Sequence, residues 1–377
     1  MGKALNADML YFLFDSVNMH RWNDHLCIIE LTELDKQAHK AAIVWVLGKY
    51  EEDETDCELD WNMMIEHTLF SFIQRLVMTD LKPQVFHRVI AEKLNEVNRF
   101  VMKSFNKAVP DTDEDFKLRL ESYLKSKKNS KEDDIINAAH YLATRWEFKT
   151  IRDANRSMYG IEQTSKEIDE QIMQYKELAG VRKLIDDEDN FNFVDLLGQL
   201  RFQQRWARTP RMPKTTVLGH SLMVANMIFL NDVDRKADPK QAYNNFYTAL
   251  FHDLPEVLTK DVITPIKVNV DGLAKLLESY EKELIEQKVM PLIPEGWRRE
   301  LESMVLEPFT DIENRTGVDI KACDLMAAYI EAHISICYGI SSKALVDGER
   351  ELKDKLEKMG KGIDAKNLVE SFDKIVV

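Results

Sequence analysis

The sequence contains few cysteines and no long apolar run. Cys27, Cys57, Cys323 and Cys337 show neither the paired spacing of a zinc ribbon nor the density of a disulfide framework. No stretch approaches the ~20 consecutive apolar residues of a membrane-spanning helix, and the N-terminus lacks the apolar segment of a secretory signal. We therefore expect a cytoplasmic protein with reduced cysteines and no membrane partner.

Positive charge is also scarce, with 51 Lys and Arg residues against 65 Asp and Glu residues and a formal net charge of -14. General nucleic-acid binding requires clustered Lys and Arg at the phosphates. The charge balance therefore argues against a nucleic-acid partner and favours a small-molecule substrate. The exception is the segment 201–214, which has five basic residues and no acid: Arg201, Arg205, Arg208, Arg211 and Lys214. This segment predicts either a solvated basic loop or a pocket that receives a phosphate.

Strand-type alternation is not evident, whereas apolar residues at helical spacing recur along nearly the whole chain. The sequence therefore predicts an all-α fold. A length of 377 residues suffices for two domains with separate cores, and we place their boundary near Gly160, which gives domains 1–162 and 163–377. The predicted helices include Ala7 to Met19, Glu33 to Tyr50, Ser165 to Ile185, Val217 to Leu230 and Val318 to Tyr338.

A weak internal repeat relates the two predicted domains. The matched features keep one order along the chain. At an offset of 184, Arg21-Trp22 matches Arg205-Trp206, and Asn137 to His140 matches Lys321 to Asp324. At an offset of 181, His39 matches His220, Leu69-Phe70 matches Leu250-Phe251, and Asp80 matches Asp261. Agreement of several weak matches in one order favours a duplication over chance.

The two predicted domains differ where chemistry is expected. The adjacent pair His252-Asp253 is matched by Ser71-Phe72, Glu256 by Arg75, and Asp324 by His140. A metal site does not survive the loss of its central His-Asp pair. The first domain therefore reads as a degenerate copy, in which His39 is interpreted as a packed or capping histidine.

The stretch from Phe251 to Asp261 concentrates the chemistry of the second domain. It brings His252, Asp253, Glu256 and Asp261 together around a proline. An apolar helix that ends at Leu254-Pro255 can direct an imidazole and a carboxylate into one pocket.

Four residues form the predicted metal-binding set: His220, His252, Asp253 and Asp324. Taken singly, His220 is expected to cap or pack a helix start, whereas Asp324 interrupts an apolar helix and therefore needs a partner or a metal. Two imidazoles and two carboxylates suit a divalent ion with open positions for water and substrate. Because structural zinc sites prefer thiolates, the set indicates a catalytic site.

The order and spacing of these residues resemble those of the HD-domain metal-dependent phosphohydrolases. Within that superfamily, Arg205-Trp206, His220-Ser221, the run from His252 to Asp261 and Thr264-Pro265-Ile266-Lys267 are similar to the bacterial 5'-deoxynucleotidase branch, over about residues 193 to 340. The resemblance implies two tandem HD-like helical domains, of which the second, 163–377, carries the metal site.

The resemblance also implies a role for each residue. His220, His252, Asp253 and Asp324 would bind a divalent ion (Mn, Co, Zn, Fe or Mg), and the catalytic residues would be Glu256 at the attacking water, Asp261 at the sugar or leaving group, and Arg205 at the phosphate. Trp206 would lie against the deoxyribose, and Lys267 is a weaker candidate for a further phosphate contact, as are Arg211 and Lys214. Small members of the branch form homodimers, so we expect the degenerate copy to act as a built-in partner, with a further homo-oligomer left open.

The expected reaction is hydrolysis of (deoxy)nucleoside 5'-monophosphates to nucleoside and phosphate. The alternatives are an HD-type dNTP triphosphohydrolase, a nucleotide phosphodiesterase, and a nucleotide-sensing regulator without turnover. Glu256 and Asp261 beside a full ligand set disfavour the regulator, because a sensor has no need of a carboxylate that activates water.

Overall fold

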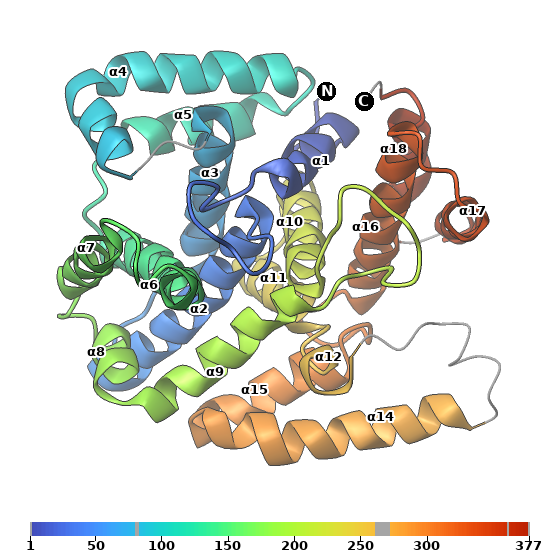
Figure 1. Cartoon of the computed structure of the whole chain (residues 1–377). Coiled ribbons are helices and arrows are strands. Elements are labelled where there is room, and N and C mark those ends of the chain that lie inside the picture. Colours follow the sequence, from blue (N-terminus) through green and yellow to red (C-terminus); the bar gives the residue numbers. More distant parts are fainter. Residues whose placement is uncertain (1, 80–82, 261–271, 360–361, 376–377) are drawn as a thin grey trace.

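The computed structural model describes residues 2–79, 83–260, 272–359 and 362–375, which fold into helices joined by short loops (Figure 1). Within these residues the only strand-like pairings are isolated bridges, such as His20 with Thr32, so the all-α prediction is confirmed. The helices are α1 (Ala7–Phe14), α2 (Glu33–Thr55), α3 (Trp61–Met78), α4 (Pro83–Ala108), α5 (Glu114–Lys125), α6 (Lys131–Ala154), α7 (Ile161–Met173), α8 (Ala179–Asp186), α9 (Glu188–Gln199), α10 (Val217–Arg235), α11 (Pro239–Phe251), α12 (Glu256–Thr259), α14 (Leu273–Leu284), α15 (Glu295–Leu306), α16 (Gly317–Cys337), α17 (Lys343–Lys358) and α18 (Ala365–Phe372), with the short 3-10 turns η1 (Asp15–Asn18) and η2 (Leu200–Phe202).

Helices α2 and α10 lie at the centre of the molecule (Figure 1). The buried residues of α10 run without a break from Val217 to Asp232, so other helices cover it on all sides. Helices α2, α11 and α16 cover α10, while α6, α8 and α10 cover α2. The two central helices therefore hold both halves of the chain against each other.

The two central helices begin in the same way. Thr216 caps α10 by accepting a hydrogen bond from the Gly219 amide, and Thr32 caps α2 by accepting one from the Asp35 amide. Each cap also forms a bridge with the segment before it, Thr216 with Gln204 and Thr32 with His20. The corresponding residues of the two helix starts all share the offset of 184. The two halves thus share this cap and bridge structure at the offset of 184.

The pairing of His39 with His220 is wrong. At the offset fixed by the helix caps, Lys36 corresponds to His220, and both lie in the first turn of their helix. The His39 ring instead places Nε2 2.9 Å from the carbonyl oxygen of Val194 and packs edge-on against Trp146. The interpretation of His39 as a packed histidine is therefore confirmed.

The single helix predicted from Ser165 to Ile185 is also wrong, because a turn separates α7 from α8. The turn brings Gly180 against α2, where an added Cβ would lie 3.0 Å from the Cα of Leu47. Helix α7 packs on α6 and α8 packs on α2. The division into domains 1–162 and 163–377 stays a prediction.

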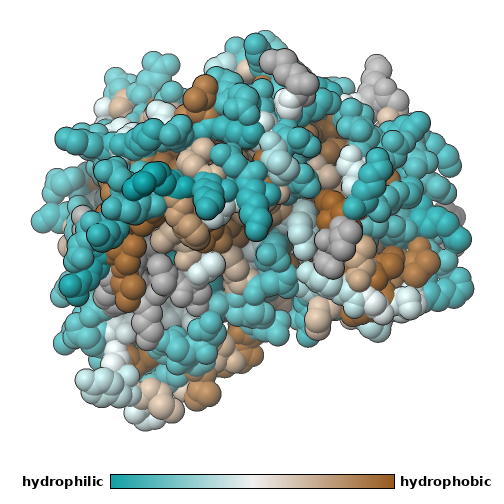
Figure 2. Space-filling view, turned by 90° about the horizontal axis from the view of Figure 1, so that it is seen from above, coloured by the Kyte–Doolittle hydropathy of each residue, from teal (hydrophilic) through white to brown (hydrophobic). Residues whose placement is uncertain are grey.

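The surface seen in Figure 2 is mostly hydrophilic, with apolar side chains in scattered patches. Among the helices that the structure describes, none combines the length and apolar character needed to cross a bilayer.

Candidate metal centre

His220 is brought to the site by the first turn of α10. Its side chain is completely buried, with Nε2 3.0 Å from Asp324 Oδ1 and Nδ1 3.5 Å from Glu331 Oε1. Burial and the positive charge of Arg205 lower the pKa of His220, but its interactions with the two carboxylates raise it further, so the net shift is upward. The ring is therefore hydrogen-bonded to Asp324 through Nε2, while Nδ1 faces Glu331 without a hydrogen bond to any described residue.

His252 and Asp253 lie where α11 ends. The Nδ1 of His252 lies 2.7 Å from the carbonyl oxygen of Ala249, one turn back in the helix. If Nδ1 donates to this carbonyl, the lone pair on Nε2 faces the site, which is how metal-binding histidines are usually oriented. Nε2 of His252 and Oδ2 of Asp253 are buried without a hydrogen-bond partner among the described residues. Both atoms therefore have a ligand position to fill.

Asp324 joins the site from α16. Its Oδ1 accepts the bond to His220, and its Oδ2 lies 2.7 Å from the ammonium of Lys321. Burial would raise the pKa of Asp324, but the hydrogen bond with His220, the His252 ring 3.9 Å away and the positive charge of Lys321 hold it well below its usual value. The carboxylate is therefore anionic, as a metal ligand must be.

The three side chains His220, His252 and Asp324 each present one ligand atom within 4.8 Å of the others. Asp253 lies beside this triad, with Oδ2 3.3 Å from His252 Nε2. A nitrogen and oxygen donor set with two unsatisfied buried atoms fits a divalent metal ion. The fold thus brings His220, His252 and Asp324, which belong to the predicted set, together from α10, the end of α11 and α16.

Arg205 and Trp206 precede α10, and both contact Glu331. The guanidinium of Arg205 lies 3.1 Å from Glu331 through Nε and 3.7 Å from Asp253 through Nη1. The indole Nε1 of Trp206 donates to the same Glu331 oxygen at 2.9 Å. An added Cβ on Gly348 of α17 would lie 2.9 Å from the Trp206 ring, so the absence of a side chain there permits the ring to lie against α17.

Glu331 connects these groups and was not predicted from the sequence. It accepts hydrogen bonds from Arg205, Trp206 and the Thr215 hydroxyl, the last at 2.7 Å. Burial would raise the pKa of Glu331, but Arg205, His220 and Arg211 hold it well below its usual value. Glu331 follows Asp324 by seven positions on α16, a spacing of two helical turns that places both on one face and could have revealed it.

The basic segment 201–214 does not converge on the site as a whole. Arg201 is buried and turns to Glu147 of the N-terminal half, at 3.1 Å. Arg211 is also buried and donates to the Thr215 hydroxyl, while Lys214 is exposed. Arg205 is the member of this segment that lies against the His252-Asp253 pair.

The remaining predicted residues lie after α11. Glu256 begins α12, and its negative charge is one of those that raise the pKa of Arg205 against the opposing effect of burial. Asp261 and Lys267 lie outside the described residues. The structure therefore places Glu256 near the triad and does not test the other two.

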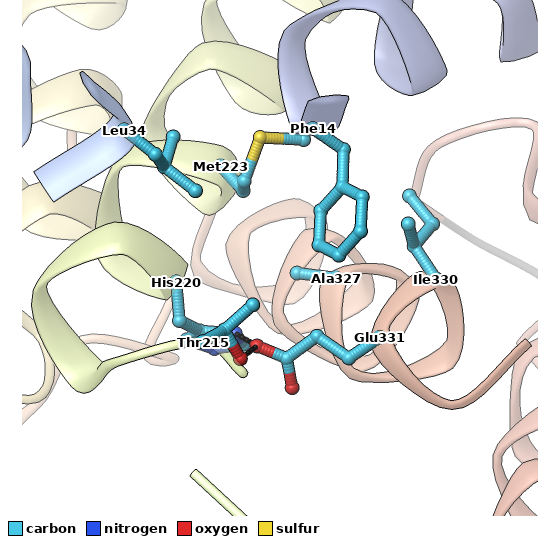
Figure 3. A pocket seen from close by; sticks show the side chains of 8 residues that line it. All are labelled: Phe14, Leu34, Thr215, His220, Met223, Ala327, Ile330 and Glu331. Carbon is cyan, nitrogen blue, oxygen red and sulfur yellow. Dashed lines mark hydrogen bonds and ion pairs between the residues drawn. The ribbon is translucent and has the colours of Figure 1, made fainter. Parts of the chain in front are cut away.

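The N-terminal half packs beside His220. Figure 3 shows a narrow space in which the polar ends of His220, Thr215 and Glu331 converge, with Phe14 and Leu34 on the opposite side. Both apolar side chains come from the N-terminal half. This half therefore packs next to one of the candidate ligands and its partner Glu331.

Comparison with known proteins covers the C-terminal half. Residues 192–374 match the model of the family described as 5'-deoxynucleotidase YfbR-like. A 5'-deoxynucleotidase of Shewanella oneidensis is 25% identical over 141 residues, which span 36% of this chain and 69% of that protein. A 5'-deoxynucleotidase of Pectobacterium atrosepticum is 29% identical over 143 residues, 37% of this chain and 70% of the relative. One from Klebsiella pneumoniae is 26% identical over 163 residues, 42% of this chain and 80% of the relative.

Proposed function

Residues 192–374 form a YfbR-like domain of the HD superfamily, and from this premise we propose that the protein hydrolyses (deoxy)nucleoside 5'-monophosphates to nucleoside and phosphate. The observation that carries the proposal is the buried triad His220, His252 and Asp324, whose ligand atoms lie within 4.8 Å of one another. The names of the similar 5'-deoxynucleotidases support the substrate class.

In the proposed site, His220, His252, Asp253 and Asp324 hold a divalent ion. When bound, such an ion supplies Lewis acidity to the phosphate and lowers the pKa of a coordinated water. Experiment must decide which of the ions Mn, Co, Zn, Fe and Mg the site binds. Glu331 orients His220 from the opposite ring nitrogen at 3.5 Å, and such outer partners usually tune ligand affinity.

The other residues act on the substrate. Arg205 is fixed by Glu331 and binds the phosphate dianion, for which a guanidinium is geometrically suited. Glu256 accepts the proton of the attacking water, and Trp206 lies against the sugar. We assign Asp261 to the sugar or leaving group and Lys267 to the phosphate by resemblance alone. In-line attack at phosphorus then releases the nucleoside.

We further propose that residues 1–162 form a degenerate HD-like domain that serves as a built-in partner of the catalytic domain 163–377. The support is the packing of Phe14 and Leu34 beside His220 and Glu331 and the bond from the Thr216 hydroxyl to the Asp35 carboxylate between the two halves. We also propose a cytoplasmic location and a small-molecule nucleotide as the partner, without nucleic acid or membrane.

The test is phosphate release from a panel of nucleoside mono- and triphosphates, after chelation and re-addition of single metals. We expect metal-restored release from monophosphates, about 100-fold or more slower in Glu256→Gln because general base catalysis contributes about that much. Glu256→Gln should retain metal, measured as bound ion per chain, whereas Asp253→Asn should lose it. The control is Glu351→Gln, an exposed residue of α17.

Other outcomes would replace the proposal. Release of triphosphate from dNTPs, with monophosphates untouched, would establish the triphosphohydrolase alternative, and cleavage of a nucleotide diester alone would establish the phosphodiesterase. If the protein binds metal and nucleotide without turnover, it is a sensor.

A further inference from the structure

The N-terminal half carries a buried cluster of basic side chains at the position that corresponds to the metal centre. Lys36 lies in the first turn of α2, as His220 does in α10, and its ammonium is hydrogen-bonded to His140 of α6. His140 in turn corresponds to Asp324. A metal ligand and its carboxylate partner are thus replaced by an ammonium and an imidazole.

Further cations surround this pair. Lys40, one turn later on α2, donates to the hydroxyl of Ser71 at 2.7 Å. Burial, followed by the positive charges of Lys36, Lys40, Arg21 and Arg75, lowers the pKa of His140, which places all four cations around one imidazole.

In the part of the chain that the structure describes, the cluster contains more basic than acidic side chains. Among the described residues, the carboxylates paired with it are Glu33, 2.8 Å from Arg21 and 3.6 Å from Arg75, and Glu147, 2.8 Å from Arg21. Neither Lys36 nor Lys40 makes an ion pair with a described carboxylate, and both are buried. Burial lowers the pKa of both amines, that of Lys36 well below its usual value and that of Lys40 to about 8, and an anion that reached them would stabilise their protonated forms.

The two arginines of the cluster are as exposed to solvent as residues of the metal centre. The side chains of Arg21 and Arg75 are 11% and 17% exposed, against 14% for Arg205 and 17% for Asp253. An anion can therefore contact these arginines from solvent, while Lys36 and Lys40 lie deeper.

We propose that this cluster binds a phosphate group, either as free phosphate or as the phosphate of a nucleotide, and does not hydrolyse it. Ammonium and guanidinium donors are the groups that recognise phosphate. At the offset of 184 that the helix caps share, Glu256, the proposed base, corresponds to Phe72, so the N-terminal half has no carboxylate at that position to activate water. The proposal goes beyond the reaction of the C-terminal half and does not depend on it.

The test is calorimetric titration of the full-length protein with inorganic phosphate after metal removal by EDTA, so that hydrolysis plays no part. We expect one saturable site, whose affinity falls at least about tenfold in Lys40→Met and in Arg75→Gln, since a charged hydrogen bond is worth roughly that factor. Circular dichroism and melting temperature confirm folding of each variant. Lys49→Met is the matched control, because Lys49 lies on the same helix and pairs with Glu300 instead, and it should stay within about twofold.

Two further titrations locate the binding site and identify its ligand. Arg205→Gln should keep phosphate binding, because Arg205 belongs to the C-terminal centre. A nucleoside monophosphate that binds more tightly than phosphate, with the same dependence on Lys40, would identify a nucleotide as the ligand, whereas equal affinity would identify free phosphate. No saturable binding, or binding lost in Arg205→Gln and kept in Lys40→Met and Arg75→Gln, would overturn the proposal.

Discussion

Glu331 offers the sharpest test of how the centre is held together. Its carboxylate is 2% exposed, and it contacts Arg205 at 3.1 Å, Trp206 at 2.9 Å and the Thr215 hydroxyl at 2.7 Å. The substitution Glu331→Gln keeps the shape and removes the charge, which leaves Arg205 buried with Asp253 3.7 Å away. Because removal of one partner of a buried ion pair costs about 3–5 kcal/mol and the amide retains some hydrogen bonds, we expect a loss of about 3 kcal/mol.

The N-terminal half supplies a matched variant. The Glu147 carboxylate accepts hydrogen bonds from Arg21 at 2.8 Å and from the Trp22 indole at 3.0 Å. It corresponds to Glu331 at the offset that the helix caps share. Glu147→Gln should therefore destabilise the protein by a similar amount in urea unfolding. Only Glu331→Gln should also slow phosphate release, by about 10- to 100-fold, because only it orients a proposed metal ligand.

Activity is to be compared at a temperature at which both variants are folded by circular dichroism. Equal loss of activity in the two variants would show that global stability, and not orientation of Arg205 and His220, explains the effect. An unchanged rate in Glu331→Gln would refute the argument that the buried carboxylate positions the site.

Three further predictions concern stability. Burial and Arg201 lower the pKa of His39 from 6.5 to about 3. The free energy of unfolding is therefore highest above about pH 6.5, where the unfolded chain also leaves His39 neutral, and it falls by about 2 kcal/mol at pH 5. The variant His39→Gln should lack this fall when urea unfolding is compared at pH 5 and pH 8. Burial raises the pKa of Asp232 from 3.8 to about 6, so stability is lost as pH rises from 3.8 to 6; Asp232→Asn should raise the melting temperature at pH 8, by up to about 3 kcal/mol of stability, and change it little at pH 4, and equal effects at both would contradict the assignment. Thr216→Ala removes the cap of α10 and the bond to Asp35 and should cost about 1–2 kcal/mol in urea unfolding; an unchanged midpoint would rule out that contribution.

Local features of the sequence predicted where several of the candidate ligands lie on their helices. His220 begins a helix after a threonine cap, and His252-Asp253 ends one before a proline. These signals depend on residues within one or two turns, so the sequence alone could show them. The prediction that His220, His252 and Asp324 share a site required the order of the motif in a known superfamily as well.

The register of the repeat shows why sequence alone failed elsewhere. The two offsets in the predicted repeat differ by three, and side chains three positions apart on a helix lie on nearly the same face. The apolar pattern therefore hardly distinguishes them, and His39 was matched with His220 because both are histidines. The helix caps Thr32 and Thr216 fix the larger offset, and Lys36 takes the position instead.

The sequence by itself determined the all-α class, the helix ends near which His220, His252 and Asp253 lie, and the absence of this residue pattern from the N-terminal half. Only the tertiary structure decided that Glu331 joins Arg205 to Trp206, that Arg201 crosses to Glu147, and that Lys36 and Lys40 form one basic cluster. The reason is physical. Helix periodicity and capping depend on neighbours in the chain, whereas contacts between polar atoms that are far apart in the sequence depend on how whole helices pack.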